Sequence, residues 1–297
     1  MRLFHRKFSR RTMLVRSAQA VAFGAAASRM GPLFAAAKSR WFKIGACDWS
    51  IGKACSTEAF EVAKQIGLDG VQVSMGSVRN DMHLRKPEMQ KAYLEAAEKA
   101  GQEMASLAIA EMNSVPLKSD PRAARWLAES VDVCKALGLT ISMPACFARG
   151  DLDMAKTKEI DHFVKVLKDV APKAEKEGVI IGLENYLSAE DNMKIIDRVG
   201  SPAVQVYYDV GNSTDKGRDI LKEIRTLGAR KLICEFHAKD GPHMLGKGRI
   251  DFKQVRKAID DIDYSGWIII EAARPHSLLP DYRAHCEYLK GIFPPAG

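Results

Sequence analysis

Four side chains that could share a metal ion stand at the ends of four consecutive apolar runs. They are Glu184 after VIIGL, Asp209 after AVQVYY, His237 after KLICEF and Glu271 after GWIII. A single acid in such a place is more often a helix cap, and an unpaired acid is costly to bury. Three carboxylates that crowd together need a counter-ion, and a divalent cation is the simplest one. The pattern predicts a metal site, provided that the four runs are neighbouring strands.

The alternation of side chains along a strand indicates that these four groups point toward the same place. Residues two positions apart share a face, so Glu235 points the same way as His237 but lies about 6.6 Å deeper. We expect Glu235 to be an interior residue, hydrogen-bonded to a neighbour such as Gln205, and not a metal ligand. The opposite faces carry Leu183, Val206, Cys234 and Ile268, which are expected to pack against helices.

Eight short apolar runs alternate with longer amphipathic segments from residue 42 onward. The runs span 42–48, 70–74, 104–110, 139–145, 179–184, 203–209, 231–237 and 266–271, and helices are predicted over 57–65, 87–100, 121–137, 159–176, 193–199, 220–227 and 252–262. Run starts recur about every 32 residues, which is the length of one strand–helix unit. Eight such units predict an α/β fold, a single (β/α)8 TIM barrel of about 250 residues whose active site lies at the carboxyl ends of the strands. An open doubly wound sheet is the alternative, but its Gly-rich phosphate turn is absent after the first run.

The positive charge of the chain is concentrated at its N-terminus. The formal net charge is +8, yet residues 1–37 hold seven basic residues and no acid, so the rest has 38 basic against 37 acidic residues. A basic start, an apolar middle and an A-x-A end are typical of a secretory signal peptide. Residues 9–14, SRRTML, resemble the twin-arginine (Tat) motif. We therefore expect a signal peptide over 1–37, a barrel domain over 38–297 and an exported, periplasmic protein. A disordered basic tail is the alternative.

Two classes of partner, a membrane and a nucleic acid, are not expected. Arg29 interrupts an apolar run that is already shorter than the roughly 20 residues of a membrane span, so no stable membrane anchor is expected after signal cleavage. The near-neutral body offers no phosphate-tracking surface, so no nucleic-acid partner is expected. The six cysteines contain no C-x-x-C pair, which argues against a zinc knuckle or a thioredoxin-like site.

With these residues placed, residues 42–292 resemble the xylose isomerase-like TIM-barrel superfamily. Within it, the chain is similar to the sugar phosphate isomerase/epimerase group that includes ketose 3-epimerases and hydroxypyruvate isomerase. The motifs that carry the resemblance are GLEN, YYDVGN, H-x-K-D followed by LGKGRIDF, and IIIE. The resemblance implies that Glu184, Asp209, His237 and Glu271 are the metal ligands. It also implies that Glu184 and Glu271 are the catalytic proton-transfer pair.

Around the substrate, the chain departs from the ketose-epimerase pattern. Glu190 matches that pattern, but Asn212 stands where relatives have His, His243 where they have Arg, and Lys247 replaces an acid in the glycine turn. A free ketohexose is therefore questionable as the substrate. The candidate substrate contacts are Glu190, Asn212, Lys239, His243 and Trp49, with Gln72, Ser74 and Glu111 as further candidates for the pocket lining.

Oxygen ligands with one imidazole suit one divalent ion, Mn²⁺ first, with Mg²⁺ or Co²⁺ also compatible. The expected reaction is isomerisation or epimerisation through a metal-stabilised enediolate. Export and the lack of an Arg-rich phosphate cradle favour an unphosphorylated sugar or keto-sugar as the small-molecule partner. The alternatives are a lyase or hydrolase that acts on a 3-keto glycoside with the same two acids, a non-catalytic sugar-binding barrel and, least favoured, a phosphodiesterase. Because relatives often form dimers or tetramers, a homo-oligomer is also an open expectation.

Overall fold

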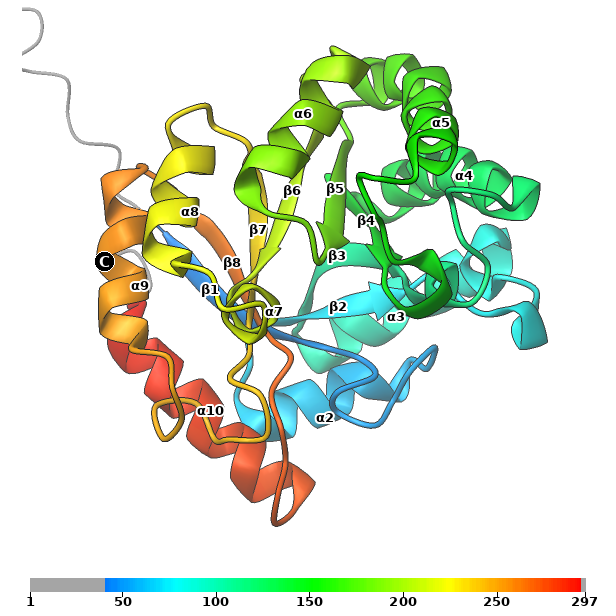
Figure 1. The fold of residues 1–297 in the computed structure, drawn as a ribbon. Coiled ribbons are helices and arrows are strands. Elements are labelled where there is room, and N and C mark those ends of the chain that lie inside the picture. The colour runs from blue at the N-terminus through cyan, green and yellow to red at the C-terminus, as the bar shows by residue number, and fades with distance from the viewer. Residues whose placement is uncertain (1–40, 295–297) are drawn as a thin grey trace, which may run out of the picture. The chain divides into compact units, whose positions relative to one another are not determined.

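Eight parallel strands close into a barrel in the computed structural model, which describes residues 41–294 (Figure 1). The strands are β1 (Phe42–Cys47), β2 (Gly70–Ser74), β3 (Glu103–Ile109), β4 (Ile141–Cys146), β5 (Ile180–Asn185), β6 (Val204–Asp209), β7 (Ile233–Ala238) and β8 (Gly266–Ile270). Each lies within two residues of a predicted run, and β1 pairs with β8 to close the ring. The predicted TIM barrel is confirmed. The predicted signal peptide lies outside the described residues.

Helices surround the barrel. They are α2 (Glu58–Ile66), α3 (Pro87–Ala100), α4 (Pro121–Leu137), α5 (Thr157–Glu177), α6 (Ala189–Val199), α7 (Val210–Asp215), α8 (Ile220–Gly228), α9 (Phe252–Asp261) and α10 (Leu278–Ile292). The prediction omitted α7 and α10 and began α6 four residues late. The Ser188 hydroxyl accepts a hydrogen bond from the backbone N–H of Asp191, which starts α6 earlier than its apolar periodicity indicates. Among the described helices, none is both long and apolar enough to cross a membrane.

The outer core lies between the strands and the helices. Leu183, Val206 and Ile268 are buried there, as predicted from their alternation. The prediction for Cys234 is wrong, because this residue packs inside the barrel beside Tyr207. The register between β6 and β7 shifts after Val206, so Tyr207 pairs with Glu235, and Cys234 is the extra residue on β7. Such an irregularity turns a side chain to the other face of a strand.

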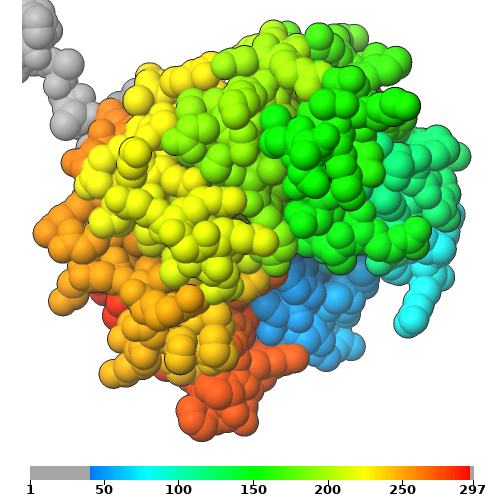
Figure 2. All heavy atoms as spheres, viewed as in Figure 1, coloured from blue at the N-terminus to red at the C-terminus, as the bar shows by residue number. Residues whose placement is uncertain are grey.

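The carboxyl ends of the strands open onto the face where the loops gather. Figure 2 shows segments from distant parts of the sequence together on one face, including the blue segment that follows β1, the yellow-green segment around α7 and the orange segment that follows β8. Below this face, side chains of β3, β4 and β6 fill the barrel interior. Reactive groups at the strand ends therefore rest on a packed floor.

Candidate metal centre

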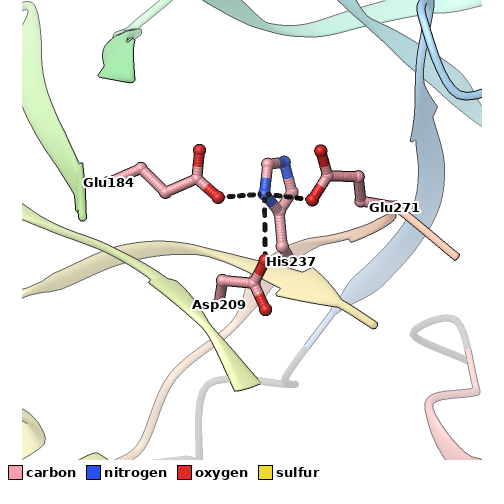
Figure 3. Close-up of side chains that lie close together, drawn as sticks. All are labelled: Glu184, Asp209, His237 and Glu271. Atoms are coloured by element: carbon pink, nitrogen blue, oxygen red, sulfur yellow. Dashed lines mark hydrogen bonds and ion pairs between the residues drawn. The ribbon is translucent and has the colours of Figure 1, made fainter. Parts of the chain in front are cut away.

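The four predicted metal-binding side chains meet at one point (Figure 3). Glu184 lies on β5, Asp209 ends β6, His237 lies on β7, and Glu271 directly follows β8. Each offers one donor atom, and these atoms all lie within 4.8 Å of one another. The four residues converge because they occupy the same end of four adjacent strands. Their side chains can therefore reach one ion together.

His237 presents its two ring nitrogens to different surroundings. Its Nδ1 lies 2.7 Å from Glu184 Oε1, 3.9 Å from Asp209 Oδ2 and 3.9 Å from Glu271 Oε2. Its Nε2 points down into the barrel, 2.9 Å from Gln72 Oε1. His237 is completely buried. The nitrogen that faces the three acids is thus Nδ1, and Nε2 is left for a hydrogen bond to the protein.

One oxygen of Asp209 has no hydrogen-bond partner. Its Oδ1 accepts hydrogen bonds from the backbone N–H groups of Gly211, at 2.7 Å, and Asn212, at 2.9 Å, and so caps α7. Its Oδ2 is buried, faces the cluster and accepts no hydrogen bond. Burial, with a smaller contribution from Glu271, raises the pKa of Asp209 to about 7. A buried, unpartnered carboxylate oxygen beside two other acids fits a site for a hard divalent cation.

Glu271 is the most accessible acid of the cluster, with 21% of its side chain exposed. Its Oε1 accepts a hydrogen bond from Trp49 Nε1, and its Oε2 accepts one from Lys239 Nζ, both at 2.9 Å. Burial alone would raise the pKa of Glu271, but the nearby His237 and Lys239 together hold it below its ordinary value. Lys239 Nζ also lies 3.8 Å from Asp209 Oδ2. Glu271 is therefore held in its ionised form.

Glu235 lies below the cluster and is not part of it. Its Oε1 accepts hydrogen bonds from Ser106 Oγ, at 2.9 Å, and from Tyr207 OH, at 3.0 Å. The expected partner Gln205 was wrong, because its amide donates to the backbone oxygen of Pro202. Burial raises the pKa of Glu235 to about 7, although both hydroxyls oppose that rise. The register shift places Tyr207 opposite Glu235, whereas Gln205 lies two residues nearer the start of β6.

The predicted substrate contacts divide into two groups. Trp49 and Lys239 touch Glu271, and Asn212 is buried beside Asp209 through its backbone N–H. Glu190, in the first turn of α6, and His243 are exposed, and neither contributes an atom to the cluster.

Two further pocket candidates lie beneath the mouth rather than around it. Gln72 is fully buried and bonded to His237, while the Ser74 hydroxyl donates to the buried Asp48. The sequence analysis did not single out Ser106 and Tyr207, which hydrogen-bond to Gln72 and Glu235 beneath the cluster. The available signal was a polar side chain inside an otherwise apolar strand.

Comparisons with known proteins agree with this architecture. A family model described as xylose isomerase-like TIM barrel matches residues 60–292. The 2-epi-5-epi-valiolone 7-phosphate 2-epimerase of Actinoplanes sp. is 25% identical over 204 residues, which cover 67% of this chain and 73% of that protein. The structure of D-psicose 3-epimerase from Clostridium cellulolyticum H10 superposes with a TM-score of 0.71 at 17% identity, over 84% of this chain and 99% of that one. The 3-keto-D-glucoside 4-epimerase of E. coli gives a TM-score of 0.68 at 14% identity, with the same coverage of both chains. At these identities, the two solved structures show the shared fold alone.

Proposed function

The chain belongs to the xylose isomerase-like TIM-barrel family, and we propose that it is a divalent-metal-dependent isomerase or epimerase of an unphosphorylated sugar or keto-sugar. The observation that carries this proposal is the cluster of three carboxylates around His237 Nδ1, in which Asp209 Oδ2 accepts no hydrogen bond. The names of the relatives, which are epimerases of sugars or of a related cyclic phosphate, support the reaction class.

The residues that would hold the ion are Glu184, Asp209, His237 and Glu271. Three carboxylates with one imidazole match the donor preference of Mn²⁺, and Mg²⁺ and Co²⁺ are compatible with the same set. When bound, such a cation polarises a substrate carbonyl and stabilises the negative charge that develops on its oxygen.

Proton transfer is assigned to Glu184 and Glu271. In Figure 3 their carboxylates approach the centre of the cluster from opposite sides. One carboxylate can remove a carbon-bound proton while the other returns a proton to the opposite face or to the adjacent carbon. Lys239 and Trp49 keep Glu271 ionised and fix its orientation, because each donates to a different oxygen of this carboxylate.

The substrate class follows from the charges at the mouth. Lys239 is the cation in contact with the cluster in the described part of the chain, and it is already paired with Glu271 and Asp209. It is therefore not free to neutralise a phosphate group. The Actinoplanes relative is named for a 7-phosphate, so phosphorylated sugars belong in the test as a competing class.

The test is incubation of the Mn²⁺-loaded protein in deuterated water with ketoses, 3-keto glycosides and phosphorylated ketoses, followed by NMR and mass spectrometry. We expect deuterium at a carbon next to the carbonyl, with the carbon skeleton intact. Glu184→Gln and Glu271→Gln should lower the exchange rate by about 10²–10⁴-fold. Glu223→Gln, a change at a buried acid that bonds to Tyr208 outside the cluster, serves as the control.

Each contrary outcome identifies the part of the proposal that fails. Loss of a fragment from the substrate would indicate a lyase. Turnover restricted to phosphorylated ketoses would overturn the substrate class. Absence of deuterium from every sugar would overturn the reaction itself.

A further inference from the structure

A chain of buried polar side chains crosses the barrel beneath the metal cluster. Gln72 on β2, Ser106 on β3, Tyr207 on β6 and Glu235 on β7 are each 0–1% exposed. They come from strands on opposite sides of the barrel, yet they form one connected set of hydrogen bonds that ends at His237. Buried polar groups generally pair donor with acceptor, so the direction of each hydrogen bond in this set can be worked out. The exception is Glu235 Oε2, which is buried and has no partner.

The direction of these hydrogen bonds is determined by the Glu235 carboxylate. Its Oε1 is an acceptor, and it lies 2.9 Å from Ser106 Oγ and 3.0 Å from Tyr207 OH. A hydroxyl has one hydrogen to give, and each of these two gives it to the carboxylate. Their oxygens are then left as acceptors toward the rest of the chain.

The amide of Gln72 is oriented by those two hydroxyls. Its Nε2 lies 3.0 Å from both Ser106 Oγ and Tyr207 OH, so its two hydrogens go to these two oxygens. The other end of the amide, Oε1, must then face His237 Nε2 at 2.9 Å. An amide oxygen only accepts, so Nε2 carries a ring hydrogen. Nδ1 lies 2.7 Å from Glu184 Oε1, which is another acceptor, so in the metal-free protein Nδ1 carries a hydrogen as well, and an incoming ion displaces that hydrogen alone. The Cys47 thiol lies 3.3 Å from Gln72 Oε1 and 3.4 Å from His237 Nε2. Because Nε2 already carries a hydrogen toward Gln72, the thiol hydrogen goes to Oε1 as a second donor.

We propose that Gln72, held by Ser106, Tyr207 and Glu235, is a positioning residue that fixes the tautomer of His237 so that Nδ1 offers its lone pair to a metal ion. With the amide of Gln72 turned over, Nε2 would face a donor and the hydrogen would move to Nδ1, which would block the ligand. The inference rests on the metal site of the proposed function. Mutation of a residue that hydrogen-bonds to a metal-bound histidine typically costs 10–100-fold in metal affinity or activity.

The test is the Kd for Mn²⁺, measured by calorimetric titration of the full barrel after removal of metal by EDTA and dialysis. Tyr207→Phe removes one of the two anchors of Gln72, and we expect its Kd to rise by about tenfold. Tyr208→Phe is the matched control. It is the next residue on β6, and its buried hydroxyl donates to a different acid, Glu223, at 2.8 Å. We expect its Kd to stay within about twofold of the wild type.

A double-mutant cycle separates positioning from a general loss of packing. Gln72→Met removes both the donor and the acceptor of the amide at similar length. If Tyr207 acts through Gln72, adding Tyr207→Phe to Gln72→Met should leave Kd within about twofold of Gln72→Met alone. Ser106→Ala, the smallest change in the chain, gives the same comparison if Tyr207→Phe does not fold.

The outcomes distinguish the network from the metal site. A wild-type protein that binds no Mn²⁺ would refute the proposed metal centre itself. A wild type that binds Mn²⁺, together with an unchanged Kd in Tyr207→Phe and Ser106→Ala, would overturn the positioning role alone. Additive effects of Gln72→Met and Tyr207→Phe would also overturn it, because two independent packing defects add.

Discussion

Replacing Asp209 by Asn should stabilise the metal-free protein and abolish its stabilisation by Mn²⁺. The amide keeps the oxygen that caps α7 through Gly211 and Asn212. It removes one negative charge from a buried site where Glu184 and Glu271 lie within ion-pair reach of the same His237 nitrogen. An acid that destabilises the metal-free protein and stabilises the metal-bound protein behaves as a metal ligand and not as a structural residue.

The magnitude follows from the pKa of Asp209. Its pKa rises from 3.8 to about 7 on folding, so the folded protein holds a proton that the unfolded chain releases over that range. The contribution of Asp209 to the free energy of unfolding therefore falls as pH rises from about 4 to about 7, and at pH 8 this loss is about 4 kcal/mol. Asn has no such loss, and for a domain of this size 4 kcal/mol corresponds to about 8–16 °C in Tm. The advantage of Asp209→Asn should fade toward pH 4.

The assay is thermal unfolding in EDTA and in Mn²⁺, at pH 4, 6 and 8. At 100 times Kd, Mn²⁺ should stabilise the wild type by about 2.7 kcal/mol, or about 5–11 °C, and leave Asp209→Asn unchanged. Asp48→Asn is the matched control, because burial also raises the pKa of Asp48, to about 6. Both of its oxygens accept hydrogen bonds from Ser74 or Cys55, so Asn places a donor against donors there. That control should lose about 1–3 kcal/mol with or without metal.

Two results would refute the reasoning. In EDTA at pH 8, an Asp209→Asn variant that melts at or below the wild-type temperature would show that the cluster carries no electrostatic cost. An equal rise in Tm of both proteins with Mn²⁺ would show that Asp209 does not bind the ion.

Three further predictions concern the active site, the barrel and the N-terminus. Lys239→Met removes a cation that lowers the pKa of Glu271, so the acid limb of the pH–rate profile should move to higher pH; an unmoved limb would contradict this role. Gly182→Ala places a methyl group 2.7 Å from the Cys234 thiol, which should lower the free energy of unfolding in urea by about 1–3 kcal/mol. An unchanged urea midpoint would show that the barrel interior accommodates the methyl group. Replacement of both Arg10 and Arg11 by Lys should retain the uncleaved chain in the cytoplasm, whereas the wild type should show an intact mass that starts at residue 38; equal export of both would argue against a twin-arginine signal.

Local pattern was sufficient to predict the strands and the four strand-end groups. A strand in a closed barrel needs an apolar face, so its residues alternate in a way that can be read within six positions. The order of the strands follows from the strand–helix repeat, which places consecutive strands side by side. Convergence of Glu184, Asp209, His237 and Glu271 then needs only that they share one end and one face of adjacent strands.

The features that the sequence did not predict depend on contacts between distant strands. The hydrogen bond from His237 to Gln72 joins residues 165 positions apart, and nothing local in either strand indicates which polar side chain will lie opposite. The register shift after Val206 turned Cys234 inward and placed Tyr207 opposite Glu235, to which its hydroxyl donates a hydrogen bond. Such a shift depends on how the strands pair when the ring closes, which no local pattern indicates.

What the sequence alone determined is therefore the architecture and the identity of the groups at the barrel mouth. The tertiary structure decided which nitrogen of His237 faces the acids and what holds the other. The reason is that the barrel interior is packed, so the partners available to a buried donor or acceptor are those that closure of the ring brings within reach.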